Sequence, residues 1–128
     1  MTLTTRKMAQ RHEQDVADRL GGRLTRGSGS TWVDQTDGKH STQEGRAYPF
    51  SWDCKSTLGK SMSISRATIA KLREQTAAGL FPLLPIRFYR DERLTMVDED
   101  LVALDLELFE DILADAELGA RARRELGW

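Results

Sequence analysis

Residues 48–55 carry the clearest periodic pattern in the chain, and this pattern constrains the fold more than any other feature. Two sets of side chains alternate along it: Tyr48, Phe50, Trp52 and Cys54, then Pro49, Ser51, Asp53 and Lys55. Successive side chains of a strand point to opposite faces of a sheet. The pattern therefore predicts a β-strand with one buried aromatic face and one face that carries an acid and a lysine.

Other periodic segments predict two helices and further strands. Apolar residues at helical spacing predict a helix over residues 5–20, which Gly21-Gly22 stops, and another over residues 66–78 after a capping Ser65. Strands are expected over residues 23–26, 80–89 and 93–97, and the Asp37-Gly38 dipeptide is typical of a hairpin turn. This order predicts an α/β fold with a mixed β-sheet flanked by helices.

The length of 128 residues indicates one domain. We expect a core over residues 1–97, followed over residues 98–128 by an acidic C-terminal helix that packs on the same domain. The chain has no long apolar run and one cysteine, which excludes an internal disulfide and a cysteine zinc site. These features predict a cytoplasmic protein without a membrane partner.

Charge is divided unevenly along the chain. Residues 1–90 hold 15 Lys and Arg against 8 Asp and Glu, a net charge of +7, whereas residues 91–128 hold 4 against 12, a net charge of −8. A basic body suits contact with phosphates, which supply much of the affinity for nucleic acids. The split therefore favours a nucleic-acid partner, although charge also fluctuates along chains without one.

The acid and the lysine of the predicted strand suggest hydrolysis of a phosphodiester. Carboxylates hold hard divalent cations, and such a cation can activate water and neutralise phosphate charge. Asp53 and the backbone carbonyl of Cys54 are candidate ligands, with Glu13 from the first helix and either Asp37 or Asp34. Lys55 lies two residues after Asp53, where its ammonium group could orient a water molecule.

Two polar loops are candidate phosphate contacts. Arg26 precedes the Gly27-Ser28-Gly29-Ser30 loop, whose small residues leave room for a close approach of the backbone to a phosphate. Ser28 and Ser30 add hydroxyl groups, and Lys60 adds a cation in the loop that follows residue 55. A plain linker explains the glycine-serine loop equally well.

In chain order, Glu13, the Arg26–Ser30 loop, Asp37 and Asp53-Cys54-Lys55 resemble the PD-(D/E)XK nuclease superfamily, and most closely the small Holliday junction resolvases of archaea and phages. The resemblance spans about residues 6–97. It implies metal ligands at Glu13, Asp37 and Asp53, a catalytic lysine at Lys55, and substrate contacts at Arg26 and Ser30.

The same resemblance implies a restriction-endonuclease-like sheet and dependence on Mg²⁺, for which Mn²⁺ can substitute. It also implies a homodimer that cuts branched DNA symmetrically in the cytoplasm of a bacterium or a phage-infected host, without a small-molecule cofactor. The acidic tail has no counterpart in this comparison. The alternatives are another nuclease of the superfamily, of a nicking or repair type, and a DNA-binding assembly protein without catalysis.

Overall fold

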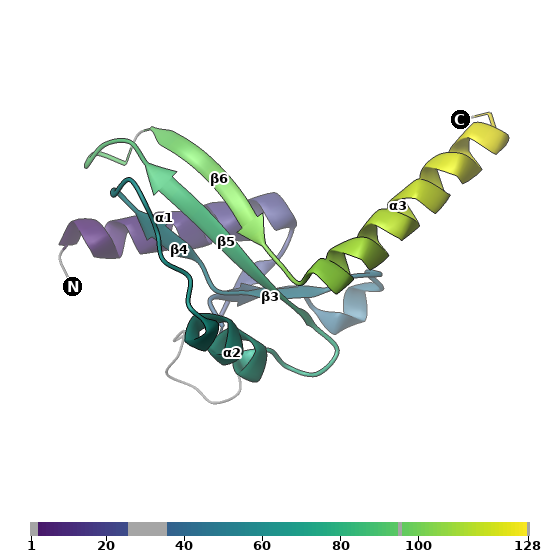
Figure 1. Ribbon diagram of the computed structural model, residues 1–128, viewed down its shortest axis with the longest axis horizontal. Helices are drawn as coiled ribbons and strands as arrows, with labels where there is room; N and C mark the ends of the chain where they lie inside the picture. The colour runs from purple at the N-terminus through teal and green to yellow at the C-terminus, as the bar shows by residue number, and fades with distance from the viewer. Residues whose placement is uncertain (1–2, 26–35, 95, 128) are drawn as a thin grey trace.

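The structure is a computed structural model that describes residues 3–25, 36–94 and 96–127. The described residues form a mixed sheet of six strands with three α-helices (Figure 1). The elements are α1 (Leu3–Leu20), β1 (Arg23–Leu24), β2 (Gly38–Lys39), the short 3₁₀ turn η1 (Thr42–Glu44), β3 (Phe50–Trp52), β4 (Lys55–Thr57), α2 (Arg66–Gln75), β5 (Phe81–Tyr89), β6 (Val97–Ala103) and α3 (Leu106–Glu125).

Strand β5 is the centre of the sheet. Both β3 and β4 pair with it in parallel, and in both pairs each residue lies opposite the one 31 positions further along the chain. The shared offset shows that β3 and β4 are two parts of one strand, interrupted at Asp53 and Cys54. Strand β6 pairs antiparallel with β5 on its other side, and β2 and β1 extend the sheet beyond β3.

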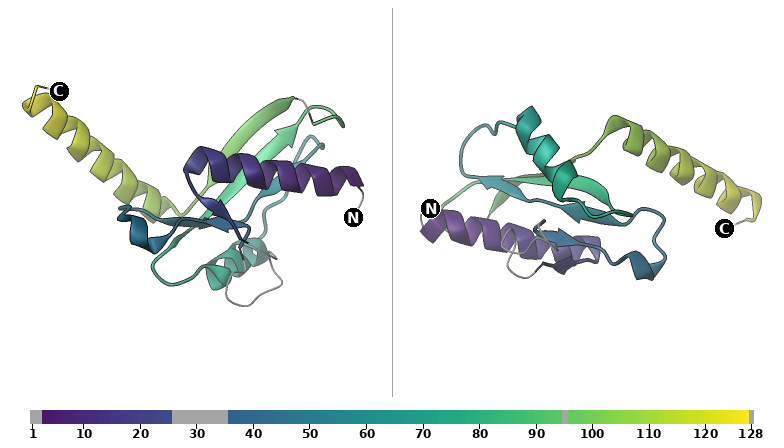
Figure 2. Two further views of the ribbon diagram at one scale, coloured as in Figure 1. Left: turned by 180° about the vertical axis from the view of Figure 1, so that it is seen from behind. Right: turned by 90° about the horizontal axis from the view of Figure 1, so that it is seen from below.

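Helices α1 and α2 cover opposite faces of the sheet (Figure 2, right). Val16 and Ala17 of α1 pack on Trp52 and Leu83, and Leu72 of α2 packs on Leu84 and Ile86. Neighbouring residues of β5 therefore serve two cores, as the alternation of side chains along a strand requires. The expected α/β fold with a mixed sheet flanked by helices is confirmed, whereas the closer likeness to restriction endonucleases stays a prediction.

The predicted strand over residues 48–55 is correct in place but wrong in continuity. Its ladder stops after Trp52 and resumes at Lys55. By the offset of 31, Cys54 lies opposite Pro85, which has no N–H group to donate. The predicted polar face is also not fully exposed, because Ser51 is buried and its hydroxyl lies 2.6 Å from the hydroxyl of Thr36.

The predictions for residues 93–100 are wrong. Strand β6 begins at Val97 rather than ending there, and Asp98, Glu99 and Asp100 lie in this strand and not in a helix. Two of these acids pair with arginines of the preceding segment: Asp98 with Arg90 at 2.6 Å and Asp100 with Arg87 at 2.7 Å. The acidic run therefore reflects ion pairs across the sheet, and α3 starts at Leu106. The division into residues 1–97 and 98–128 stays a prediction, but the second part is not helical throughout.

The Asp37-Gly38 dipeptide does not form the predicted hairpin turn, because Gly38 opens strand β2. Its role is steric: a Cβ atom at Gly38 would lie 2.4 Å from Nε1 of Trp52, and one at Gly22 would lie 2.3 Å from Cη2 of the same indole. Trp52 is fully buried, so its ring has no room to move away. The absence of a side chain at the two glycines thus leaves the space that the Trp52 indole occupies, which we call the Trp52 seat.

No helix in the described part of the chain is both long enough and apolar enough to cross a membrane. The expectation of a protein without a membrane partner is not tested further by this observation.

Gly38→Ala should lower the free energy of unfolding by about 1–3 kcal/mol, because the added methyl group overpacks the Trp52 seat. Urea denaturation followed by tryptophan fluorescence measures the change. Gly119→Ala is the matched control, since the nearest atom to its added Cβ is the flexible end of Arg123 at 3.8 Å. Equal stability of the Gly38→Ala variant and the unaltered chain would contradict this account of the core.

Candidate active site

Asp37 directly precedes β2 and is hydrogen-bonded to the interruption between β3 and β4. Its backbone N–H donates both to the carbonyl of Trp52 at 2.9 Å and to Oδ1 of Asp53 at 3.1 Å. Its own Oδ2 accepts a hydrogen bond of 2.7 Å from the backbone N–H of Cys54. The carboxylate of Asp53 thereby binds the backbone of Asp37, the carboxylate of Asp37 binds the backbone of Cys54, and both half-buried carboxylates are held at one point of the sheet.

Glu13 reaches the same point from α1. Its carboxyl group lies within hydrogen-bonding reach of the Asp37 carboxyl group. Burial, the charge of Asp37, a hydrogen bond with its side chain and the charge of Asp53 together raise the pKa of Glu13 to about 7. Glu13 therefore lies close enough to Asp37 and Asp53 for their charges to act on it, and its side chain is half-buried on α1. That these three acids form one catalytic or metal site stays a prediction.

Two lysines act on the carboxylates. Burial and the charge of Asp37 raise the pKa of Asp53, whereas the ammonium groups of Lys55 and Lys71 lower it in part. Lys55 lies on β4 and Lys71 on the exposed side of α2. Sequence analysis missed Lys71, because it belongs to a helix in a distant segment and no spacing rule connects it to Asp53. The sequence offered one signal for Lys71, its place on the exposed side of α2 between the apolar positions of that helix.

Cys54 lies beside the carboxylates but is not a nucleophile. Burial and the negative charges of Asp37, Glu13 and Asp53 raise the pKa of its thiol far above the ordinary range, which keeps it neutral. Its side chain packs against the core cluster that contains Trp52. Its contribution to the site is its backbone, whose N–H orients Asp37.

The donor set suits a divalent cation by its chemistry. Three carboxylates from three elements repel one another, and hard cations such as Mg²⁺ and Mn²⁺ take oxygen ligands of this kind. Over the described residues, no group of three or more His, Cys, Asp or Glu side chains is placed to hold a metal ion. A metal site at these acids therefore stays a prediction.

Lys60 is exposed in the loop after β4. The candidate contacts Arg26, Ser28 and Ser30 and the alternative ligand Asp34 lie outside the described residues. Asp37 interacts with Glu13, Asp53 and Cys54, and the choice between Asp37 and Asp34 as the second acid stays a prediction.

A second charged cluster lies near the site and has a structural role. Arg87 of β5 is buried, and its guanidinium contacts Asp15 of α1 at 2.6 Å and Asp100 of β6 at 2.7 Å. His12 is buried nearby, and burial followed by the charge of Arg87 lowers its pKa to about 4. His12 is therefore neutral at physiological pH and is packed inside the fold.

Comparison of the chain with protein-family models, with curated proteins and with solved structures gives no match. The arrangement of the residues is therefore the basis for a functional proposal.

The Glu13 cluster should make the stability of the fold depend on pH. Because the folded pKa of about 7 exceeds the ordinary value of 4.5, folding retains a proton that the unfolded chain loses, and this contribution to stability declines as the pH rises from about 4.5 to about 7. His12 acts in the opposite direction, since its lowered pKa destabilises the fold as the pH falls from 6.5 to about 4.

Glu13→Gln isolates the first effect. In EDTA buffer, thermal unfolding from pH 4.5 to 8 should show that the variant gains stability relative to the unaltered chain as the pH rises. Glu110→Gln, at an exposed position of α3, is the control and should follow the unaltered chain. Parallel pH curves for Glu13→Gln and the unaltered chain would show that Glu13 does not retain a proton in the fold.

Proposed function

We propose that the protein is a metal-dependent endonuclease that hydrolyses phosphodiester bonds of branched DNA, with four-way junctions as its preferred substrate. The observation that carries this proposal is the approach of Glu13, Asp37 and Asp53 from three separate segments of the chain, with Lys55 and Lys71 acting on Asp53. A cluster of repelling, half-buried acids has no value for stability, which favours a functional reason for it.

In this proposal Glu13, Asp37 and Asp53 hold Mg²⁺ or Mn²⁺, with the backbone carbonyl of Cys54 as a further ligand. A divalent ion bound there supplies neutralisation of phosphate charge and acidification of a bound water. Because a ligand must be deprotonated to bind the ion, the raised pKa of Glu13 makes affinity for the ion increase with pH.

The lysines complete the chemistry. Lys55 on β4 lies on the exposed side of the strand, where its ammonium group can orient the attacking water and offset charge on the transition state. Lys71 supplies a second positive charge from α2. Lys60, and Arg26, Ser28 and Ser30 from the segment before β2, are proposed contacts to the DNA backbone.

The second candidate is a DNA-binding assembly protein without catalysis. Two observations favour it: no described group of three acids is placed to hold an ion, and α3 extends from the sheet with exposed apolar side chains that suit a protein partner. A metal-dependent product separates the two candidates, because the assembly protein gives none. Another nuclease of the PD-(D/E)XK type would cut linear duplex as fast as a junction.

Asp53→Asn should abolish cleavage of an end-labelled four-way junction and leave junction binding intact, because the amide keeps the shape of the side chain and loses its charge. The unaltered chain should cut with Mg²⁺ and with Mn²⁺, and should not cut with EDTA. Asp18→Asn is the matched control on the exposed side of α1 and should cut normally.

Symmetric paired cuts near the branch point are the expected product. If a matched linear duplex is cut at the same rate, the protein is a general nuclease and not a junction resolvase. Binding with no cutting under either metal would leave the assembly protein as the better description.

Lys55→Ala should lower the cleavage rate about 100-fold or more, because it removes a positive group from the developing charge. Lys71→Ala should lower the rate less, because Lys71 acts on Asp53 more weakly than Lys55 does. Lys60→Ala is the comparison and should raise KM with little change in kcat, as expected for a phosphate contact. Single-turnover kinetics on the junction measure all three. An undiminished rate for Lys55→Ala would remove it from the catalytic site.

A further inference from the structure

Helix α3 presents an exposed apolar row along one side. The row consists of Leu106, Phe109, Leu113, Ala116 and Ala120, and we name it the α3 seam. Its three large members are well exposed: Leu106 by 70%, Phe109 by 46% and Leu113 by 48%. The spacing alternates between three and four residues, which is the seam of a helix that pairs with another helix. Apolar side chains that stay in contact with water do not stabilise a protein, so a continuous exposed row suggests a binding surface.

The seam does not face the body of the protein. Leu108, which lies on another side of the helix, is buried. Asp115 lies on the same side as Leu108 and accepts a hydrogen bond from the Tyr48 hydroxyl. These contacts hold the first half of α3. The second half extends away from the sheet, and its C-terminal end lies far from every other element (Figure 1; Figure 2, left).

The order of side-chain sizes along the seam specifies its partner. The first three members are large and the last two are alanines. When two copies of α3 run antiparallel with Leu113 at the centre, Leu106 of one copy lies opposite Ala120 of the other, and Phe109 lies opposite Ala116. Large residues then meet small ones, as close packing requires. In a parallel pair large residues would meet at one end and leave gaps at the other.

The charges of α3 select the same orientation. Five of its six acids lie in the first part of the helix, at Glu107, Glu110, Asp111, Asp115 and Glu117, whereas the last turns hold Arg121, Arg123 and Arg124 beside the single acid Glu125. An antiparallel pair brings the acidic part of each copy to the basic part of the other. A parallel pair would place like charges together, which opposes association.

We propose that two copies of this chain associate through antiparallel α3 seams, around a two-fold axis at Leu113. The contact is isologous, so the same residues serve both copies and the assembly closes as a dimer. The proposal does not depend on nuclease activity. It assigns the tail of the chain to self-association rather than to a separate protein partner.

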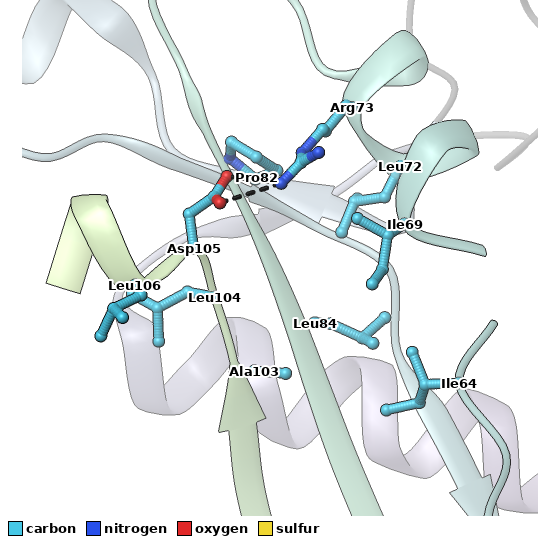
Figure 3. Close-up of a pocket in the computed structure, with 10 residues that line it drawn as sticks. All are labelled: Ile64, Ile69, Leu72, Arg73, Pro82, Leu84, Ala103, Leu104, Asp105 and Leu106. Atoms are coloured by element: carbon cyan, nitrogen blue, oxygen red, sulfur yellow. Dashed lines mark hydrogen bonds and ion pairs between the residues drawn. The ribbon is translucent and has the colours of Figure 1, made fainter. Parts of the chain in front are cut away.

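An apolar pocket continues the surface of the seam onto the body. It lies between α2, β5 and the start of α3, where Ile69, Pro82, Leu104 and Leu106 line it beside the ion pair of Arg73 and Asp105 (Figure 3). In the antiparallel pair the C-terminal turn of the partner helix arrives next to this pocket. Leu126, which is 65% exposed, is the side chain of that turn suited to fill it.

Light scattering coupled to size exclusion, or sedimentation equilibrium, tests the proposal on the full chain. The unaltered chain should be a dimer. Leu113→Glu should weaken dimerisation by more than about a hundredfold, because it places two carboxylates together on the axis in an apolar contact. Leu118→Glu makes the same chemical change on the same helix at a residue that is 61% exposed and off the seam, and should remain dimeric.

Circular dichroism of both variants separates loss of association from loss of folding, and both should keep the helical signal and the unfolding temperature of the isolated fold. A monomeric unaltered chain overturns the proposal and leaves the seam to a different protein. A dimer that survives Leu113→Glu overturns it as well, because another surface then holds the copies together.

Cross-linking with a short bis-maleimide tests the orientation. A mixture of Leu106→Cys and Ala120→Cys chains should give a cross-linked pair of the two variants, whereas Leu106→Cys alone should give little. The unaltered chain, whose single Cys54 is half-buried, is the blank. Efficient cross-linking of Leu106→Cys to itself would indicate a parallel pair and overturn the antiparallel proposal.

Discussion

The exchange of hydrogen bonds between Asp37 and residues 52–54 is the contact on which the candidate site depends. Pro85 of β5 lies opposite the interruption and has no N–H to donate, so that part of the ladder with β5 is weakened. The other edge of the strand faces β2, where the carbonyls of Phe50 and Trp52 accept from the N–H groups of His40 and Asp37. The N–H of Cys54 points to the same edge and donates to the carboxylate of Asp37 at 2.7 Å. A gap in the sheet is thus converted into a place that fixes two acids.

The two charged clusters of the protein differ in how their charges are balanced. Arg87 is buried, but two aspartates meet it at 2.6 and 2.7 Å, so its charge is paired and the cluster ties α1, β5 and β6 together. In the second cluster three acids lie near one another, and burial, followed by the charge of Asp37, raises the pKa of Glu13. Lys55 and Lys71 lower the pKa of Asp53 in part from exposed positions. The first cluster stabilises the fold, whereas the second is tolerated by it.

The predictions from sequence succeed where local periodicity decides the structure. The first helix, the capping role of Ser65 and the apolar strand over residues 81–89 follow from spacing and turn chemistry, and so does the proximity of Glu13 to the buried face. The failures come from pairing between distant segments. Asp98 and Asp100 resemble the acidic first turn of a helix, but their partners are Arg90 and Arg87, and nothing local reveals a cross-strand pair. Lys71 was missed for the same reason, since the approach of α2 to Asp53 is a tertiary event.

The same pairing changes the meaning of the charge split. Asp98, Asp100 and Asp105 from the second part of the chain neutralise Arg90, Arg87, Arg19 and Arg73 of the first part. The basic body is therefore less basic than a count of residues indicates, and the proposed phosphate contacts depend on other cations, among which Lys55, Lys60 and Lys71 are exposed. Beyond Asp105 the acids of α3 lie on a helix that leaves the sheet. Their counterparts in charge are the arginines at the far end of the same helix, and a helix cannot fold back on itself. A second copy, running the other way, brings the two ends together.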